Sequence, residues 1–298
     1  MNLAFISLAP VVIFAVYIYI RDKYEHEPIG LLILSLLVGA LITIPIIYLE
    51  RFISQFMTSF SSNIGAAAFR AFAVAAFSEE IFKYFGFFLL IWGNKHFNEK
   101  FDGIVYAVFI SLGFAAVENV LYVTSYGYDV GIVRAITAVP AHALDGVAMG
   151  YFFGLAKFYP LKRKTYLCYA FLMPFILHGI YDFILMAEFK FMWFLFIPFI
   201  LLLWYYGLKL MKTLSEQSVY RNDGIGNQDS NIFGLMISNE EGRISCTTDM
   251  RSMCFHAVLI LESIGSYLFL FSIFVHCTRV QSGNICFILF ITPSLINN

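Results

Sequence analysis

Long apolar runs separated by short charged or polar segments make up most of residues 2–210. A helix needs about 20 mainly apolar residues to cross a bilayer. The runs that meet this length lie at 2–20, 30–49, 66–92, 104–125, 132–156, 165–187 and 191–210. The pattern therefore predicts an all-α polytopic membrane protein with about seven transmembrane helices.

Basic residues are concentrated in the segments that follow the first, third, fifth and seventh runs. Cytoplasmic loops carry an excess of Lys and Arg, so we expect these segments, including Lys209 to Arg221, to lie in the cytoplasm. The N-terminus is then outside the cell. No basic residue precedes the first run, which distinguishes it from a cleavable signal peptide and favours an uncleaved span.

The character of the chain changes after Arg221. No lysine follows Lys212, and four of the five cysteines, all but Cys168, fall beyond this point. We therefore interpret 1–221 as one seven-span domain and 222–298 as an atypical linker and apolar appendage, whose origin the sequence does not show. The appendage contains one further apolar run, 256–275, which is a candidate eighth span.

The composition agrees with a membrane protein. Of 298 residues, 60% are hydrophobic and 13% are charged, whereas soluble domains average about 25% charged residues. The net charge of -1 offers no basic surface for nucleic acid. The cysteines show no CxxC spacing, so we expect them to be unpaired. Partners are expected in the lipid bilayer.

Polar and ionisable side chains interrupt four of the predicted spans. Each charge at the bilayer centre costs about 2.5 to 3.5 kcal/mol, so such residues usually mark a functional site. They are Glu79, Glu80 and Lys83 on the third span, Glu118 and Asn119 on the fourth, His142 and Asp145 on the fifth, and His178 and Asp182 on the sixth. Lys83 is placed to neutralise one of the adjacent glutamates.

These residues share a depth in the membrane. Counted from the cytoplasmic ends of their spans, Glu80, Glu118, His142 and His178 all lie about 12 to 15 residues deep, which places them within about 5 Å of one plane. Unrelated polar residues would not be expected to share a plane, whereas a single site with residues from several helices requires it. We therefore expect the four spans to meet at one pocket.

The residue types indicate hydrolytic chemistry. Asp182 is spaced to fix the tautomer of His178, and Asp145 is spaced to do the same for His142. Two imidazoles and a carboxylate form the ligand set of a catalytic zinc ion. His142, His178 and one of Glu79, Glu80 or Glu118 are therefore candidate metal ligands, and Glu118 is the first choice for the carboxylate. One of the other glutamates would then act as general base. Without metal, a buried glutamate would activate water while His and Asn hold the oxyanion, and the sequence leaves both mechanisms open.

The order of these motifs resembles the PrsW intramembrane proteases, distant relatives of the CAAX-processing and bacteriocin-immunity proteases. The matching motifs are Glu79-Glu80-xx-Lys83, Gly113-Phe114-Ala115-Ala116-x-Glu118-Asn119-xx-Tyr122, His142 with Gly146 and Gly150, and His178-xx-Tyr181-Asp182. The similarity covers about residues 1–221.

The resemblance implies a membrane-embedded metallopeptidase that makes the first, site-1 cut in a single-span anti-sigma factor and thereby releases an envelope-stress sigma factor. It assigns the catalytic positions to Glu79, Glu80, Glu118, His142 and His178, with Asn119 and Asp182 as supports. Two other classes remain from the residues alone. A proton- or ion-coupled transporter also uses midplane carboxylates and histidines, and in a non-catalytic scaffold Lys83 would only fix helix register. The substrate, the metal and the oligomeric state are not encoded in any motif.

Overall fold

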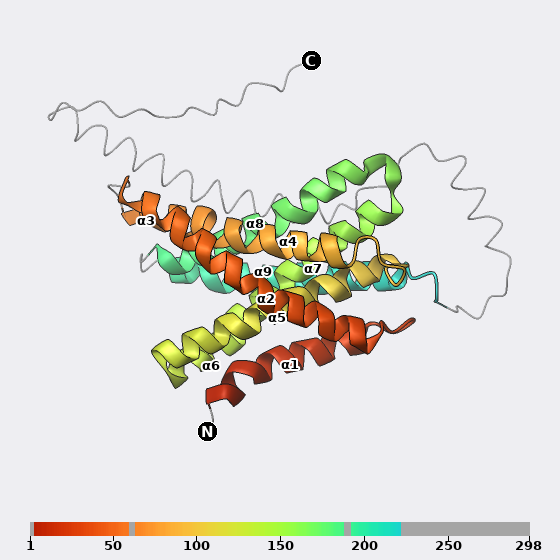
Figure 1. Ribbon diagram of the computed structural model, residues 1–298, viewed down its shortest axis with the longest axis horizontal. Coiled ribbons are helices and arrows are strands. Elements are labelled where there is room, and N and C mark those ends of the chain that lie inside the picture. Colours follow the sequence, from red (N-terminus) through yellow and green to blue (C-terminus); the bar gives the residue numbers. More distant parts are fainter. Residues whose placement is uncertain (1–2, 60–62, 188–191, 222–298) are drawn as a thin grey trace, which may run out of the picture. The chain divides into compact units, whose positions relative to one another are not determined.

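The computed structural model describes residues 3–59, 63–187 and 192–221, all within one unit that spans Met1–Asn239 (Figure 1). The described residues are helical and contain no strand, as the sequence predicts. The appendage 222–298, with its candidate eighth span, lies outside the described residues.

The helices follow the predicted spans closely. In order they are α1 Leu3–Arg21, α2 Ile29–Ser54, the 3-10 turn η1 Gln55–Ser59, α3 Asn63–Ala68, the π-helix η2 Phe69–Ala76, α4 Phe77–Leu90, α5 Lys100–Tyr126, α6 Tyr128–Ile136, α7 Ala138–Phe158, the 3-10 turn η3 Pro160–Lys162, α8 Arg163–Met186 and α9 Met192–Glu216.

Six helical segments of the described chain are long and apolar enough to cross a membrane. They correspond to the predicted spans other than the third, 66–92. That span is present as the helical stretch α3–η2–α4, but Arg70, Glu79, Glu80 and Lys83 make it too polar to qualify by composition. The count of seven therefore stays a prediction, whereas the all-helical membrane architecture is confirmed.

The predicted fifth span is two helices. Helix α6 ends at Ile136 and α7 begins at Ala138, with a break at Thr137. Pro140 explains the break, because a proline lacks an N–H donor and its ring clashes with the carbonyl four residues earlier, here that of Ile136. The predicted site residues of this segment, His142 and Asp145, therefore both lie on α7.

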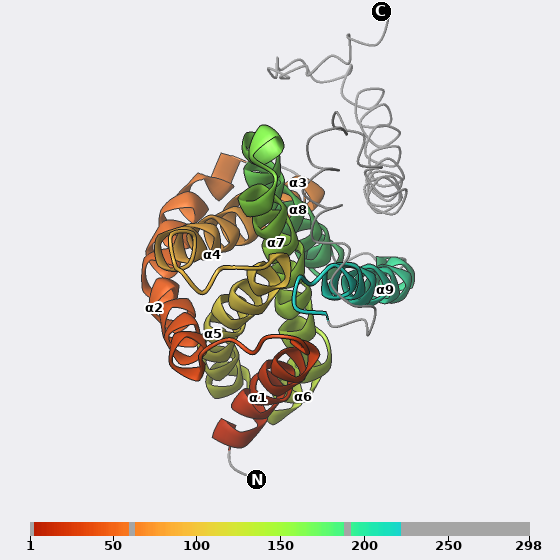
Figure 2. The ribbon, with the colours of Figure 1, turned by 90° about the vertical axis from the view of Figure 1, so that its right-hand side faces the viewer.

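Helices α5 and α7 form the centre of the bundle (Figure 2). Helix α5 packs against α7, α2 and α1, and α7 also packs against α8. Almost every residue of α7 is buried, including Asp145 and His142. His142 and Asp145 therefore point into protein rather than lipid.

Glycines allow the central helices to approach closely. A Cβ atom at Gly113 of α5 would lie 2.0 Å from the carbonyl oxygen of Leu36, and one at Gly39 of α2 would lie 1.9 Å from that of Ile110. Both distances are impossible for real atoms, so only glycine permits this crossing of α2 and α5. Close crossings of this kind are typical of membrane helix packing.

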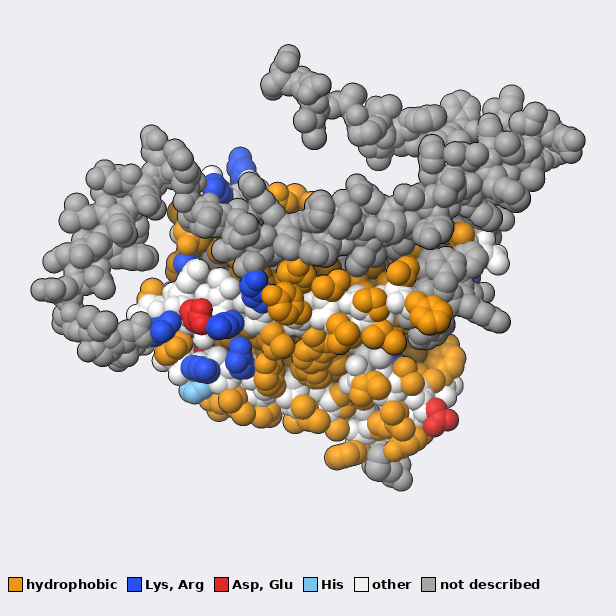
Figure 3. Space-filling model, turned by 180° about the vertical axis from the view of Figure 1, so that it is seen from behind, with side chains coloured by type: hydrophobic (Ala, Val, Ile, Leu, Met, Phe, Trp, Pro, Cys, Tyr) orange, Lys and Arg blue, Asp and Glu red, His pale blue; other side chains and the backbone are white. Residues whose placement is uncertain are grey.

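The outer surface is apolar. Exposed hydrophobic side chains cover the outward faces of α1, α2 and α9, for example Ile13, Leu41 and Leu201. Figure 3 shows such a hydrophobic face, with Lys and Arg gathered toward one end. An apolar belt bordered by charge is what a bilayer requires, and the chain is a multi-pass membrane protein.

Candidate active site

Glu79, Glu80 and Lys83 lie near the start of α4, directly after the π-helix η2. All three are buried, with Glu80 at 0% and Lys83 at 1% exposure. The Lys83 ammonium lies 2.7 Å from Glu80 Oε1 and 3.1 Å from Glu79 Oε2. It therefore bridges the two carboxylates, and its charge offsets part of the cost of burying them.

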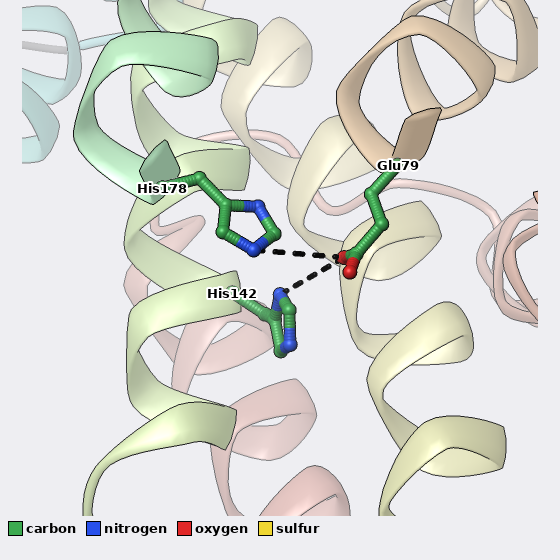
Figure 4. A group of neighbouring side chains, drawn as sticks. All are labelled: Glu79, His142 and His178. Atoms are coloured by element: carbon green, nitrogen blue, oxygen red, sulfur yellow. Dashed lines mark ion pairs between the residues drawn. The ribbon is translucent and has the colours of Figure 1, made fainter. Parts of the chain in front are cut away.

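The Glu79 carboxylate points toward two neighbouring imidazole rings (Figure 4). Its Oε2 atom is 4.0 Å from Nδ1 of His142 on α7 and 3.8 Å from Nε2 of His178 on α8. The ring centroids of the two histidines are 5.3 Å apart. Three helices thus bring one oxygen and two nitrogen donors together, as the shared depth in the membrane predicts.

The remaining nitrogen of each histidine meets a second carboxylate. Nε2 of His142 lies 2.8 Å from Glu118 Oε2, and Nδ1 of His178 lies 2.8 Å from Glu80 Oε1. Such pairs fix the orientation and tautomer of an imidazole. Asp182 lies 3.5 Å from Nε2 of His178, so the predicted Asp182–His178 pair is present, although Glu80 is the closer partner.

Two predicted supports lie elsewhere. Asp145 was expected to orient His142, but His142 pairs with Glu118 and Lys83, while Asp145 groups with Glu80 and His178. Asp145 lies three residues after His142 on α7, and its carboxylate is near Glu80 of α4 and His178 of α8. Asn119 donates to the carbonyl of Ser7 and accepts from Arg134. Its amide therefore ties α1 and α6 to α5 and does not meet the histidines.

Arg134 was not recognised from the sequence. It lies on α6, and its Nη2 is 2.6 Å from Glu118 Oε2, while its Nε donates to Asn119 at 3.0 Å. Its guanidinium also lies 4.0 Å from the ring centroid of Tyr122. In the sequence Arg134 lies at the start of the predicted span 132–156. A basic residue at that place indicates the boundary of the membrane equally well.

A cavity of about 190 Å³ opens onto these groups. Its walls include Glu79, Glu118, Arg134, His142 and His178, together with Glu50 near the end of α2. Glu80 is fully buried and does not line it. Glu50 is a second residue that sequence reasoning missed, because it lies just past the predicted span. The cavity has room for water next to the carboxylates of Glu79 and Glu118.

The donor set fits a divalent metal. Glu79, His142 and His178 each offer a ligand atom, and these atoms lie within 4.8 Å of one another. Ligands of tetrahedral zinc lie about 3.3 Å apart, so the observed separations of 3.8 and 4.0 Å need to close by less than about 1 Å. Lys83 approaches the same Glu79 oxygen at 3.1 Å, so a bound metal would share that oxygen with the ammonium.

Comparison with known proteins decides between the remaining classes. The model of the PrsW family intramembrane metalloproteases matches residues 27–206, which include all the site residues described above. The chain belongs to the PrsW family. The predicted resemblance is therefore confirmed, and the chain is a membrane-embedded peptidase.

Individual PrsW proteins are similar in sequence to this chain over most of their length. Protease PrsW of Oceanobacillus iheyensis is 40% identical over 213 residues, which are 72% of this chain and 96% of that protein. Protease PrsW of Geobacillus kaustophilus is 38% identical over 206 residues, 69% and 89% of the two chains. Protease PrsW of Bacillus subtilis is 35% identical over 208 residues, 69% and 92%. No solved structure shows significant similarity to the chain.

Proposed function

We propose that this PrsW-family protein makes the first, site-1 cut in a membrane-anchored anti-sigma factor and so frees an envelope-stress sigma factor. The observation that carries the proposal is the Glu79 carboxylate facing both His142 and His178 at a cavity within the membrane bundle. Water at such a cavity is held next to several groups able to take up a proton.

The direction of the cavity supports an extracytoplasmic cut. Its walls include Glu50 near the end of α2, Met186 at the end of α8 and Arg134 on α6. These positions belong to the helix ends opposite to the basic loops around Lys100 and Lys157. With the basic loops in the cytoplasm and the N-terminus outside, the cavity faces the outer side of the membrane.

The residues have distinct proposed roles. Glu79, His142 and His178 would hold zinc, which supplies a Lewis acid and an activated water when bound. Among the candidate glutamates we propose Glu79 as the third ligand in preference to Glu118, because Glu118 pairs with the opposite nitrogen of His142. Glu80 and Glu118 hold the two imidazoles in place.

Glu118 also lines the cavity and is the proposed general base. It takes a proton from the attacking water, whose oxygen forms a bond to the scissile carbonyl carbon. When the C–N bond breaks, Glu118 returns the proton to the departing amine. Arg134 keeps the Glu118 carboxylate directed at His142 during these transfers.

The test is cleavage by purified protein in liposomes with candidate single-span anti-sigma factors, with and without a chelator. We expect one cut on the outer side of the substrate span by the wild-type protein and none by Glu79→Gln or His178→Ala at equal protein levels. Retained cleavage by either variant would overturn the proposed site. If the protein cleaved other single-span proteins and no anti-sigma factor, the proposed substrate would be wrong.

A further inference from the structure

Glu50 is a charged residue on the wall of the cavity to which the proposed chemistry gives no role. Helix α2 lines the cavity with Thr43, Ile46, Ile47 and Glu50. Residues at this spacing lie on one face of a helix. Glu50 lies four residues before the end of α2, and Thr43 lies about 10 Å deeper along the helix axis. The Glu50 carboxylate therefore lies at the outer end of an otherwise uncharged strip.

Other carboxylates of the cavity wall are paired or covered. Three of them lie next to a basic side chain, and these pairs are Glu79 with Lys83 at 3.1 Å, Glu118 with Arg134 at 2.6 Å, and Asp182 with His178 at 3.5 Å. Asp145 is nearly covered by protein, at 2% exposure. Glu50 is only half-buried, and it forms no hydrogen bond or ion pair with any residue that the structure describes. Its carboxylate is thus available to a group that enters the cavity.

The charges around Glu50 favour a cation as that group. The charged side chains that act on it most strongly are Glu118, His178 and Asp182. Two of these are carboxylates, and the imidazole is already paired with one of them. Arg51, the next residue along α2, is exposed and does not line the cavity. A positive group that approaches Glu50 is therefore attracted, whereas a negative one is repelled.

We propose that Glu50 selects substrates with a Lys or Arg side chain on the outer side of the scissile bond. The inference rests on the proposed function, because a peptide that is cut beside Glu79 and Glu118 has to enter the cavity that Glu50 also lines. With the cavity facing outward, the part of the substrate that leads out of the membrane passes the outer end of α2. An ion pair with Glu50 would hold that segment in register with the site.

Lys and Arg suit the surroundings of Glu50. Their aliphatic stems pack along apolar surface while the charged end reaches a polar partner, and Ile46 and Ile47 supply apolar surface beside Glu50. A half-buried ion pair of this kind should change affinity by about tenfold, between the values for exposed and for buried pairs. An acidic residue at the same place would be rejected, which adds to the selectivity.

The test uses purified protein in liposomes and three versions of one single-span peptide, which contains the span and the outer segment of an anti-sigma factor. The versions carry Lys, Gln or Glu on the outer side of the cut. We expect the wild-type protein to prefer the Lys peptide over the Gln peptide by about tenfold in kcat/KM, mainly through KM. Glu50→Gln should lose this preference.

Charge reversal separates recognition from a structural role. Glu50→Lys should prefer the Glu peptide over the Lys peptide, because the attraction and the repulsion exchange places. A residue that served folding alone would not reverse the preference. Asp129→Asn, which alters an exposed carboxyl in the first turn of α6, is the matched control and should keep the wild-type preference. An unchanged preference in Glu50→Gln or Glu50→Lys would overturn the proposal.

A binding measurement distinguishes this result from failure of the proposed function. In a His178→Ala chain, which should not cut, the added change Glu50→Gln should weaken binding of the Lys peptide by about tenfold. If this difference is present but the wild-type protein cuts none of the peptides, the proposed cleavage is wrong and the role of Glu50 is supported. If all three peptides are cut and bound equally well, the cleavage is supported and the role of Glu50 is wrong.

Discussion

Glu118 Oε2 lies 2.8 Å from Nε2 of His142, on the side of the ring opposite to the nitrogen that faces Glu79. The same oxygen receives the Arg134 guanidinium at 2.6 Å. A chain of contacts thus runs from α6 through α5 to α7, and the orientation of His142 depends on a residue outside the predicted motifs.

Arg134→Gln should lower the rate of substrate cleavage by about 10- to 100-fold, because Glu118 loses the partner that directs it at His142. Arg134→Lys should restore only part of the rate, since an ammonium cannot bind Glu118 and Asn119 with the fixed fork of a guanidinium. Initial rates in liposomes measure both effects. Arg163→Gln, at the start of α8, is the control. Wild-type rates in Arg134→Gln would show that Glu118 is held without it.

Lys83→Met should destabilise the protein by about 3 to 5 kcal/mol, because it leaves two buried carboxylates without their countercharge. Replacing Glu79 and Glu80 by Gln in the same chain should restore most of this stability while leaving the protein inactive. Thermal unfolding in detergent measures the difference. A single variant as stable as the wild type would mean that another group neutralises the carboxylates.

Metal content should follow the proposed ligands. The wild-type protein should retain about one zinc ion per chain after dialysis, and His142→Ala, His178→Ala and Glu79→Gln should each lose it. Glu118→Gln should keep the ion but lose cleavage, since Glu118 is the proposed base. Elemental analysis of purified protein distinguishes these outcomes. If Glu118→Gln were the only one of these variants to lose zinc, Glu118 would be a zinc ligand and not the base.

Gly113→Ala should cost about 1 to 3 kcal/mol or more, because its Cβ would overlap the carbonyl of Leu36 and force α2 away from α5. Gly30→Ala is the matched control, since a Cβ there meets nothing within 4 Å. Thermal unfolding of the two variants compares them directly. Equal stability would indicate that the α2–α5 crossing adjusts without cost.

The sequence predicted the helices and their common depth, because the length of an apolar run and the 1.5 Å rise per residue set both quantities. It did not predict the directions of the side chains around each helix. Helix α7 is buried on nearly every side, so its pattern of apolar residues does not define one inward face. This is why Asp145 was assigned to His142, although it lies with Glu80 and His178.

The short connections were the other source of error. The segment between the first two predicted spans was described only as charged or polar, yet Asp22 and Glu27 in it are buried. Burial in a loop depends on contacts with distant segments, here the start of α5, and no local period reports them. The break at Thr137 is different, because Pro140 was visible in the sequence and its clash with the carbonyl of Ile136 follows from proline geometry.

The π-helix η2 ends at Ala76, three residues before Glu79. A π-helical turn holds more residues than an α-helical turn, so η2 sets the angular position at which α4 presents its glutamates to α7 and α8. Each residue of an α-helix turns the chain by about 100°. The same eight residues in a regular α-helix would therefore turn further and rotate Glu79 and Glu80 away from both histidines, although no residue of the site itself would be altered.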